Sequence, residues 1–384
     1  MKTVTPAQRE VALLVALRRP PQPRWEAEDS LEELARLAVS AGAEPALRLL
    51  QERAAPDPRT FIGPGKTEQV KAMCEEGIDL VIFDNDLTGS QQRNLEVAIG
   101  RKVIDRTALI LDIFAQRARS KEGKLQVELA QLRYLLPRLT GHGGELSRLG
   151  GGIGTRGPGE TQLEVDRRRI RRRIGKIEEE LEKVQRHRAL LRRHRRRKAL
   201  ATAALVGYTN AGKSSVLNAL TRASLPVADT LFATLDPTVR KVMLPDGRAV
   251  LLSDTVGFIR KLPHQLVAAF SATLEEVRVA DLLLHVIDIA HPEWQGQVRA
   301  VTGVLEELGV AAKPLIHVYN KVDALPHPDA VGFLTRQPGS VVVSAKTGAG
   351  LSQLKQAIAA TLDTLEMAPV ESKAGRGAEA TGRR

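Results

Sequence analysis

A glycine-rich segment that contains one lysine and one serine could hold the phosphates of a nucleotide. Residues 207–214 match the pattern G-x-x-x-x-G-K-[ST]. In such a loop, consecutive backbone N–H groups point at the phosphates at the start of a helix, whose dipole also favours negative charge. Lys213 would reach the β- and γ-phosphates, and the hydroxyl of Ser214 would bind Mg²⁺. The predicted phosphate site comprises Gly207, Tyr208, Thr209, Asn210, Ala211, Gly212, Lys213 and Ser214.

Three further motifs follow this phosphate loop in the order that a GTP site requires. Asp254 opens the first, where a carboxylate could hold Mg²⁺ through water, and the N–H of Gly257 could approach the γ-phosphate. Asp323 closes the second and could accept hydrogen bonds from N1–H and N2–H₂ of guanine. Adenine has no donors at that edge, and sites of this kind discriminate by factors of about 10⁴ or more. The third could offer a backbone N–H to guanine O6. The motifs are Asp254-Thr255-Val256-Gly257, Asn320-Lys321-Val322-Asp323 and Ser344-Ala345-Lys346.

Apolar runs that are typical of strands precede the phosphate loop and each of these motifs. Open α/β sheets bind ligands at the carboxyl ends of their strands, so the motifs would meet at one edge of one sheet. Their order, spacing and placement predict a P-loop GTPase domain over residues 201–366. The predicted strands of this domain are residues 203–206, 249–252, 282–287, 315–319 and 340–343.

Two positions of the predicted site differ in their chemistry from many GTPases. Phe258 follows the Asp-x-x-Gly motif, where a polar side chain commonly orients the attacking water. A phenyl ring can neither accept a proton nor align water, so we expect slow hydrolysis in isolation, with a partner or another loop completing the geometry. Asn210 resembles the asparagine of GTPases that place K⁺ against the phosphates, and it predicts different rates in K⁺ and Na⁺.

The N-terminal part of the chain alternates strand-like and helix-like patterns. This alternation predicts a small parallel α/β domain over residues 1–115. Ser30-Leu31-Glu32-Glu33 reads as a capping box that opens a helix ending near Gly42. Gly63-Pro64-Gly65-Lys66 could be a second phosphate site, but it lacks the longer P-loop spacing, and a strand-to-helix turn explains it better. The predicted strands are residues 11–17, 80–83 and 102–104.

Leucine and isoleucine residues spaced by three and four predict an antiparallel helical hairpin over residues 116–200. If residues 160–198 were all helical, the second helix would be about 58 Å long. Between the helices, residues 141–159 contain nine glycines and form the predicted tip. The expected seam consists of Leu125, Leu129, Leu132, Leu136 and Leu139 in the first helix and Ile170, Ile174, Ile177, Leu181, Val184 and Leu191 in the second.

The positive charge of the chain is concentrated in the second helix of this hairpin. The whole chain carries a net charge of +12, and residues 167–198 alone hold 16 Lys and Arg against four Glu. Such a concentrated excess indicates a polyanionic partner, and aromatic residues make up only 3% of the chain, which favours backbone recognition over base stacking. The alternative is a solvated helical spacer whose arginines contribute little.

Composition restricts the remaining possibilities. A chain of 384 residues is too long for one ordinary core, so two or three domains are expected. Cys74 is the single cysteine, which excludes an internal disulfide, and a buried position is predicted for it. Without an apolar run near the length of a membrane span, the protein is expected to be cytoplasmic. The Gly-, Ala- and charge-rich residues 367–384 are predicted to be disordered.

Several segments of the sequence resemble those of a known family. Residues 147–164 (Ser-Arg-Leu-Gly-Gly-Gly-Ile-Gly-Thr-Arg-Gly-Pro-Gly-Glu-Thr-Gln-Leu-Glu) are similar to the signature of the HflX family, and residues 157–164 are its most distinctive part. The resemblance covers about residues 10 to 365, including residues 61–66 and 84–87. A further match to the family's first switch is Phe232-Ala233-Thr234-Leu235-Asp236-Pro237-Thr238.

The resemblance implies more than the spacing alone. Thr234 would close on Mg²⁺ and the γ-phosphate, and it joins Lys213 and Gly257 in the predicted catalytic set. The neighbouring switch residues Phe232, Ala233, Leu235 and Asp236 are likewise implied to bind GTP. Proteins of this family are implied to bind the large ribosomal subunit and to separate or rescue stalled ribosomes, notably under heat stress. Two alternatives stay open: a GTPase of RNA processing or RNA modification, and a regulatory GTP-binding protein with little turnover. A monomer is expected, because one hairpin can satisfy both helical seams.

Overall fold

The computed structural model of the 384-residue chain describes residues 9–139, 162–197, 200–221, 231–232, 234–261, 271–325, 332, 334 and 337–367. The chain divides into two compact units, each of which is described by itself. The first unit comprises Met1–Arg193, Ala228–Asp236 and Lys261–Ala272. The second unit comprises His194–Val227, Pro237–Arg260 and Thr273–Arg384.

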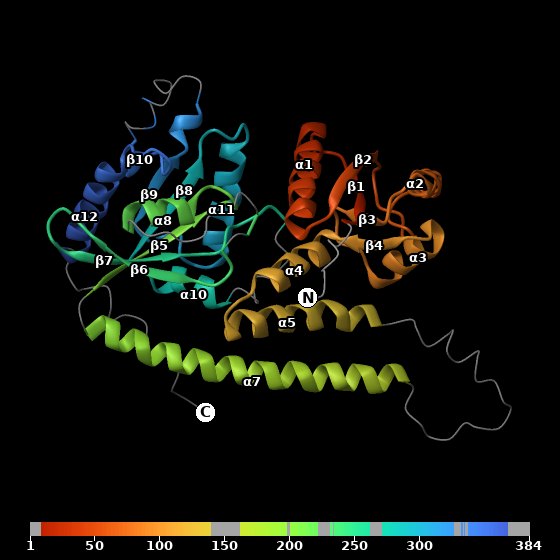
Figure 1. The fold of residues 1–384 in the computed structure, drawn as a ribbon, viewed down its shortest axis with the longest axis horizontal. Helices are drawn as coiled ribbons and strands as arrows, with labels where there is room; N and C mark the ends of the chain where they lie inside the picture. Colours follow the sequence, from red (N-terminus) through yellow and green to blue (C-terminus); the bar gives the residue numbers. More distant parts are fainter. Residues whose placement is uncertain are drawn as a thin grey trace, which may run out of the picture. The chain divides into compact units, whose positions relative to one another are not determined.

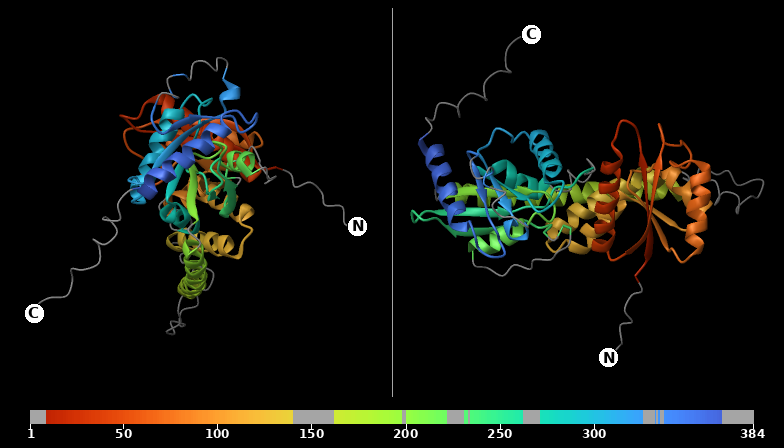
Figure 2. Two further views of the ribbon diagram at one scale, coloured as in Figure 1. Left: turned by 90° about the vertical axis from the view of Figure 1, so that its left-hand side faces the viewer. Right: turned by 90° about the horizontal axis from the view of Figure 1, so that it is seen from above.

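A four-stranded parallel sheet in the order β2-β1-β3-β4 forms the centre of the first unit. Its strands are β1 (Val11–Arg18), β2 (Glu44–Glu52), β3 (Leu80–Phe83) and β4 (Lys102–Asp105). Helices cover both faces of this sheet (Figure 2), α1 packing with α4 and α2 with α3. These helices are α1 (Arg24–Ala41), α2 (Pro64–Glu75), α3 (Gly89–Ile99) and α4 (Arg106–Arg117). The predicted parallel α/β fold of this region is confirmed.

Helix α1 begins earlier than the sequence predicted. It starts at Arg24, after Pro23, so the capping box predicted at Ser30 is wrong, whereas the predicted end at Gly42 is confirmed. Ser30 lies inside the helix, and its hydroxyl donates to the carboxylate of Asp84, with an O–O distance of 2.8 Å. The serine that resembled a cap therefore serves a long-range contact between α1 and the end of β3.

Two smaller predictions for this unit concern Cys74 and residues 63–66. Cys74 is buried, as expected. Gly63 caps α2 and Pro64 is its first residue, so residues 63–66 begin a helix as predicted, but a loop and not a strand precedes them, because β2 ends at Glu52. The sequence did not predict strand β2, in which exposed and partly buried residues alternate without a continuous apolar run.

The helical hairpin consists of α5 (Lys121–Leu135), a short 3₁₀ segment η1 (Leu136–Leu139) and α7 (Gln162–Arg197). Figure 1 shows α7 lying along α5. Lys121 pairs with Glu180 and Glu128 with Arg173, so the two helices run in opposite directions, as predicted. With 36 residues, α7 is about 54 Å long at 1.5 Å per residue. The predicted tip, residues 141–159, lies outside the described residues.

The seam of the hairpin is shorter than the leucine spacing indicated. Its buried residues are Leu125, Leu129, Ile177 and Leu181, with Leu132 and Ile174 packed against them. Leu136 and Leu139 fall in η1 and not in this cluster, because α5 ends at Leu135. Pro137 explains this end, since proline has no N–H to donate and its ring clashes with the preceding turn of an α-helix.

The second unit is built on a six-stranded sheet in the order β10-β9-β8-β5-β7-β6, in which only the pairing of β6 with β7 is antiparallel. All five predicted strands are confirmed, and β6 is an additional one. The strands are β5 (Ala201–Gly207), β6 (Thr238–Met243), β7 (Ala249–Asp254), β8 (Leu282–Asp288), β9 (Leu315–Asn320) and β10 (Ser340–Val342). The remaining elements are α8 (Lys213–Thr221), α10 (Ser271–Val279), α11 (Trp294–Glu307), η2 (Val322–Ala324) and α12 (Leu351–Met367).

The core of the second unit joins the sheet to α8 and α12. Apolar residues of both helices belong to one buried cluster with the inner strands, which fixes the start of α8 at the carboxyl end of β5. Of the predicted disordered tail, residues 368–384 lie outside the described residues. None of the described helices is both long and apolar enough to cross a membrane.

Two histidines lie next to each other on neighbouring strands of the second sheet. His285 of β8 is in register with His317 of β9, and their ring centroids are 5.4 Å apart. Burial, with smaller contributions from the charges of His317 and Lys213, lowers the pKa of His285 to about 3. Burial also lowers the pKa of His317. His285 therefore stays neutral in the folded protein under mildly acidic conditions.

Lowering the pH from 7 to 5 is expected to destabilise the second unit by about 2 kcal/mol through His285 alone. In the unfolded chain this imidazole binds a proton below about pH 6.5, whereas burial opposes protonation of the folded protein down to about pH 3. Stability that is fully present above the unfolded pKa is therefore lost as the pH falls toward the folded pKa. Calorimetric unfolding of the wild type and of His285→Leu at both pH values measures the effect. An equal loss of stability in the two proteins would contradict it.

Candidate functional site

The predicted phosphate loop connects the carboxyl end of β5 to the start of α8 in the second unit. Gly212 adopts a positive φ of 92°, and a Cβ at this position would overlap the side-chain nitrogen of Asn320. Asn320 also donates from that nitrogen to the carbonyl of Ala211 at 3.0 Å. Only glycine allows so close an approach between the phosphate loop and the end of β9.

Lys213 is the buried cation of this loop. Its ammonium donates to the carbonyl oxygens of Gly207 at 3.2 Å and Tyr208 at 2.9 Å. Burial lowers the pKa of Lys213 to about 8, and the negative charge of Asp254 opposes that shift. The side chain is thus held within the loop by backbone carbonyls, at the place where the sequence predicts the β- and γ-phosphates.

A hydroxyl and a carboxylate meet beside the start of α8. The hydroxyl of Ser214 donates to the carboxylate of Asp254 with an O–O distance of 2.5 Å, and Asp254 is almost fully buried at the end of β7. Oxygen ligands of this kind are the ones that Mg²⁺ prefers. The two residues therefore fit a magnesium ion or one of its water ligands.

The segment after Asp254 pairs with the phosphate loop through its backbone. The N–H of Thr209 donates to Phe258 O at 2.7 Å, and the N–H of Phe258 donates to Gly207 O at 3.0 Å. Two residues further, the N–H of Arg260 donates to the hydroxyl of Tyr208 at 2.9 Å. Phe258 is 1% exposed, so its ring belongs to the core. Packing therefore explains why this residue is a phenylalanine. Its backbone aligns the Asp254–Gly257 motif with the phosphate loop.

The base motifs follow β9 and β10, as predicted. Asn320 accepts from the N–H of Ala345 at 3.0 Å, which joins the two motifs. Ser344 donates to the carboxylate of Asp323 at 2.6 Å and orients it. Lys321 adopts a positive φ of 66°, and its ammonium pairs with Asp288 at 2.6 Å. The carboxylate predicted to read guanine is thus held in place by its neighbours.

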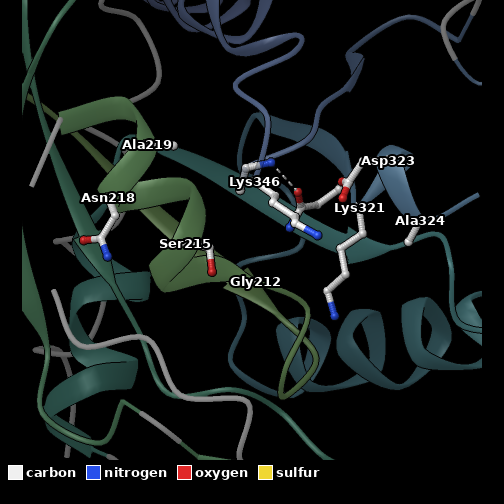
Figure 3. Close-up of a pocket in the computed structure, with 10 residues that line it drawn as sticks. Gly212, Ser215, Asn218, Ala219, Lys321, Asp323, Ala324 and Lys346 are labelled. Atoms are coloured by element: carbon white, nitrogen blue, oxygen red, sulfur yellow. Dashed lines mark hydrogen bonds between the residues drawn. The ribbon is translucent and has the colours of Figure 1, made fainter. Parts of the chain in front are cut away.

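A pocket of about 580 Å³ lies between these base motifs and α8. Figure 3 shows Ser215 and Asn218 of α8 on one side of it and Asp323 on the other. Its lining residues are Gly212, Ser215, Asn218, Ala219, Asn320, Lys321, Asp323, Ala324, Ala345 and Lys346. The pocket joins the end of the phosphate loop to the base motifs, as a nucleoside requires.

Four lining residues were not predicted from the sequence, namely Ser215, Asn218, Ala219 and Ala324. The first three lie on one face of α8, because residues three and four positions apart in a helix share a face. Helical spacing counted forward from Gly212 could therefore have found them, whereas the phosphate-loop pattern stops at Ser214.

Residues 232–236 of the predicted first switch belong to the first unit, whereas Pro237 and Thr238 belong to the second. Those of the first unit are Phe232, Thr234, Leu235 and Asp236, while Ala233 lies outside the described residues. One unit therefore brings together the phosphate loop, residues 254–257, residues 320–323 and residues 344–346. The roles of all these residues in binding GTP stay predictions.

Three family models match successive parts of the chain. They are described as "GTP-binding GTPase N-terminal" over residues 28–115, "GTP-binding GTPase Middle Region" over residues 117–195 and "50S ribosome-binding GTPase" over residues 202–321. Among solved structures, the chain resembles a GTP-binding protein from Sulfolobus solfataricus in complex with GDP. That match has 26% identity and a TM-score of 0.45, and covers 93% of this chain and 99% of the other.

Curated relatives match nearly the whole chain. The GTPase HflX of Caldanaerobacter subterraneus subsp. tengcongensis is 56% identical over 351 residues, which is 91% of this chain and 80% of the relative. The GTPase HflX of Escherichia coli K12 is 49% identical over 354 residues, covering 90% and 83%. Matches of this length extend across both units. The chain therefore belongs to the HflX family of GTPases and is a GTP hydrolase.

Proposed function

We propose that this GTPase binds the large ribosomal subunit and uses GTP binding and hydrolysis to split or rescue stalled ribosomes under stress. The observation that carries the proposal is the basic helix α7, together with the ribosome-binding description of the family model that matches residues 202–321. Such a partner would place the protein in the cytoplasm, and we propose that it acts as a monomer. The proposed parts are residues 1–115, 116–200 and 201–366, with a tail over 367–384.

The charges of the hairpin support an RNA partner. The carboxylates of Glu128 and Glu178 lie at the seam, where they pair with Arg173 and Arg133 at 2.6 and 2.7 Å. Arg171, Arg172 and Lys176 are exposed on α7. Binding of such cations to RNA phosphates releases counterions and weakens steeply with salt. Aromatic side chains are scarce, so we infer contacts to the RNA backbone and its shape.

We propose that Mg²⁺ is held by Ser214 and Thr234, with Asp254 contributing through water. When bound, the ion would neutralise part of the charge on the phosphates. The hydrogen bond between partly buried Ser214 and buried Asp254, whose oxygens are 2.5 Å apart, supports this assignment. We also propose that K⁺ contacts the phosphates beside Asn210, which adopts a positive φ of 61° within the loop. Equal GTP turnover in K⁺ and Na⁺ would contradict the proposed potassium site.

The proposed cycle follows from the two segments that would sense the γ-phosphate. GTP would order the residues around Thr234 and those from Asp254 to Phe258, and hydrolysis would release them. Because the ring of Phe258 is buried, the water-orienting group must come from elsewhere. We therefore infer that the ribosome stimulates a slow intrinsic turnover, so that the GTP form grips the ribosome and the GDP form leaves.

A multiple-turnover GTPase assay with purified ribosomal subunits tests the proposal. Large subunits are expected to raise turnover at least about tenfold, as in GTPases whose partner completes the site. The double variant Arg171→Gln/Arg172→Gln should keep the intrinsic rate and lose most of the stimulation at physiological salt. A matched control is Arg240→Gln, which removes an exposed arginine from β6 of the second unit.

The other outcomes separate the alternatives. Stimulation by small structured RNAs in place of large subunits would favour RNA processing or modification. That function needs a further catalytic group, and within the part of the chain that the structure describes, no three His, Cys, Asp or Glu side chains are grouped to hold a metal ion. Negligible turnover under every condition would favour a regulatory GTP-binding protein and overturn the proposed cycle.

A further inference from the structure

The switch segment, whose described residues are 231–232 and 234–236, is held by the N-terminal part of the first unit. The N–H of Leu231 donates to the hydroxyl of Ser40 in α1 at 3.2 Å. Phe232 meets Phe114 of α4 edge to face, with ring centroids 4.7 Å apart. Phe232 and Leu235 are both buried. Thr234 thus lies between two anchored apolar residues.

Asp236 is the last residue of this switch segment and contacts the start of α5, the first helix of the hairpin, which is called the arm helix below. Its carboxylate accepts from the N–H of Arg119 at 3.0 Å, from the N–H of Ser120 at 2.9 Å and from the hydroxyl of Ser120. Ser120 is the N-cap of α5, and its hydroxyl oxygen accepts from the N–H of Gly123 at 2.9 Å. A carboxylate here is also favoured by the positive end of the helix dipole. Asp236 and Ser120 therefore form one connected cap.

Gly123 makes room for this contact. A Cβ on Gly123 would overlap the carboxylate of Asp236 and lie 3.1 Å from the hydroxyl oxygen of Ser120. The position is helical and has no need for an unusual backbone angle, so the glycine is explained by the carboxylate that lies against it. Residues about 115 positions apart in the sequence are fitted to each other.

The flank of the other predicted switch is also anchored in the first unit. Lys261, four residues after Gly257, pairs with the carboxylate of Asp84 and donates to the hydroxyl of Ser30 at 3.1 Å. Asp84 is buried and also accepts from Arg106 at 2.7 Å. Because a buried carboxylate that loses a partner is costly, this pair opposes withdrawal of Lys261.

We propose that Asp236 is a positioning residue that couples the switch segment to the arm helix α5. The inference rests on the proposed role of Thr234, two residues before it. When GTP draws Thr234 toward the γ-phosphate, the carboxylate leaves the start of α5, and displacement of α5 by a partner eases that movement. Coupling between two sites is reciprocal, so loosening the cap must change the relative affinity for the two nucleotides.

Gly123→Ala tests the coupling from the side of the arm, without changing any residue proposed to touch nucleotide. Its matched control is Gly175→Ala, a helical glycine of α7 whose added Cβ would meet nothing within 4 Å. Gly123→Ala and Asp236→Ala are expected to raise the affinity for GMPPNP relative to GDP by about fivefold, the size of a typical N-cap contribution. Gly175→Ala should leave the ratio unchanged. Fluorescent analogues of both nucleotides report the affinities.

Hydrogen exchange of the wild type gives a second measure. Amides 119–123 should exchange faster with GMPPNP than with GDP. The coupling is overturned if Gly123→Ala has the same GMPPNP-to-GDP affinity ratio as Gly175→Ala. It is also overturned if the exchange rates of these amides are the same with both nucleotides. If the variants instead shift the ratio toward GDP, the docked segment is the GTP form and the proposed direction is wrong. Thr234→Ala distinguishes failure of the coupling from failure of the proposed function. An unchanged GMPPNP affinity in that variant would contradict the proposed role of Thr234 itself.

Discussion

Replacing Asp323 by asparagine is expected to weaken GTP binding by about 10³-fold or more and to create tight binding of XTP. The carboxylate would accept from both N1–H and N2–H₂ of guanine, and an asparagine amide must point a donor at one of these donors. Xanthine carries a carbonyl in place of the 2-amino group, so it restores a matched pair. Because Ser344 holds this carboxylate at 2.6 Å, the side chain has little freedom to avoid the mismatch.

Titration of Asp323→Asn with fluorescent GTP and XTP analogues measures this exchange of specificity. A suitable control is Asp363→Asn, which makes the same substitution on α12 at a side chain that is 56% exposed. The control should bind GTP like the wild type. Retention of GTP affinity by Asp323→Asn would remove this residue from the base site and leave the pocket beside α8 without its proposed ligand.

The sequence was most informative where chemistry and strand position coincide. Each nucleotide motif was expected at the end of a buried strand, and the structure places Gly207, Asp254 and Asn320 at the ends of β5, β7 and β9. Parallel strands bring their carboxyl ends to one edge of a sheet, so the assembly of these motifs follows from strand assignment alone. The apolar strands that carry it were easy to recognise because both of their faces are buried.

The elements that sequence patterns missed are the ones with mixed exposure. Strands β2 and β6 lie at the edges of their sheets, and each has only one buried residue among exposed and partly buried ones, which gives no continuous apolar run. The start of α1 was misplaced because Ser30 has the spacing of a cap while its hydroxyl serves Asp84 in the folded chain. Local patterns cannot distinguish a hydroxyl that caps its own helix from one that contacts a distant carboxylate.

The long-range contacts of the switch segment could likewise not be predicted from the sequence. Asp236 was assigned from family resemblance to the nucleotide site, and the structure shows its carboxylate at Ser120 and Arg119. In the sequence, Gly123 has no neighbour that indicates a contact with this side chain. A glycine within a helix is locally recognisable only as a residue of low helix propensity. The pairing depends on how a segment near residue 236 docks on an element more than a hundred positions earlier, which spacing does not encode.

Replacing Gly257 by alanine is expected to lower GTP turnover by about 10²- to 10³-fold while GDP affinity changes by no more than about threefold. A Cβ on Gly257 would lie 2.6 Å from Cα of Thr209 and 2.9 Å from the ammonium of Lys213. The first of these neighbours is backbone and cannot yield, so the segment must withdraw from the phosphate loop. Withdrawal removes the N–H that would reach the γ-phosphate, whereas the backbone groups proposed to hold the phosphates of GDP stay in place.

Single-turnover hydrolysis and GDP binding of Gly257→Ala distinguish a sensing role from a merely structural one. The matched control is Gly303→Ala in α11, where an added Cβ would meet nothing within 4 Å and alanine suits the helix better than glycine. Equal loss of GDP and GTP binding would mean that the substitution collapses the phosphate loop. Unchanged turnover would mean that the pairing of residues 257–258 with the loop is incidental to hydrolysis. Only the loss of hydrolysis with GDP binding retained fits a backbone that reads the third phosphate.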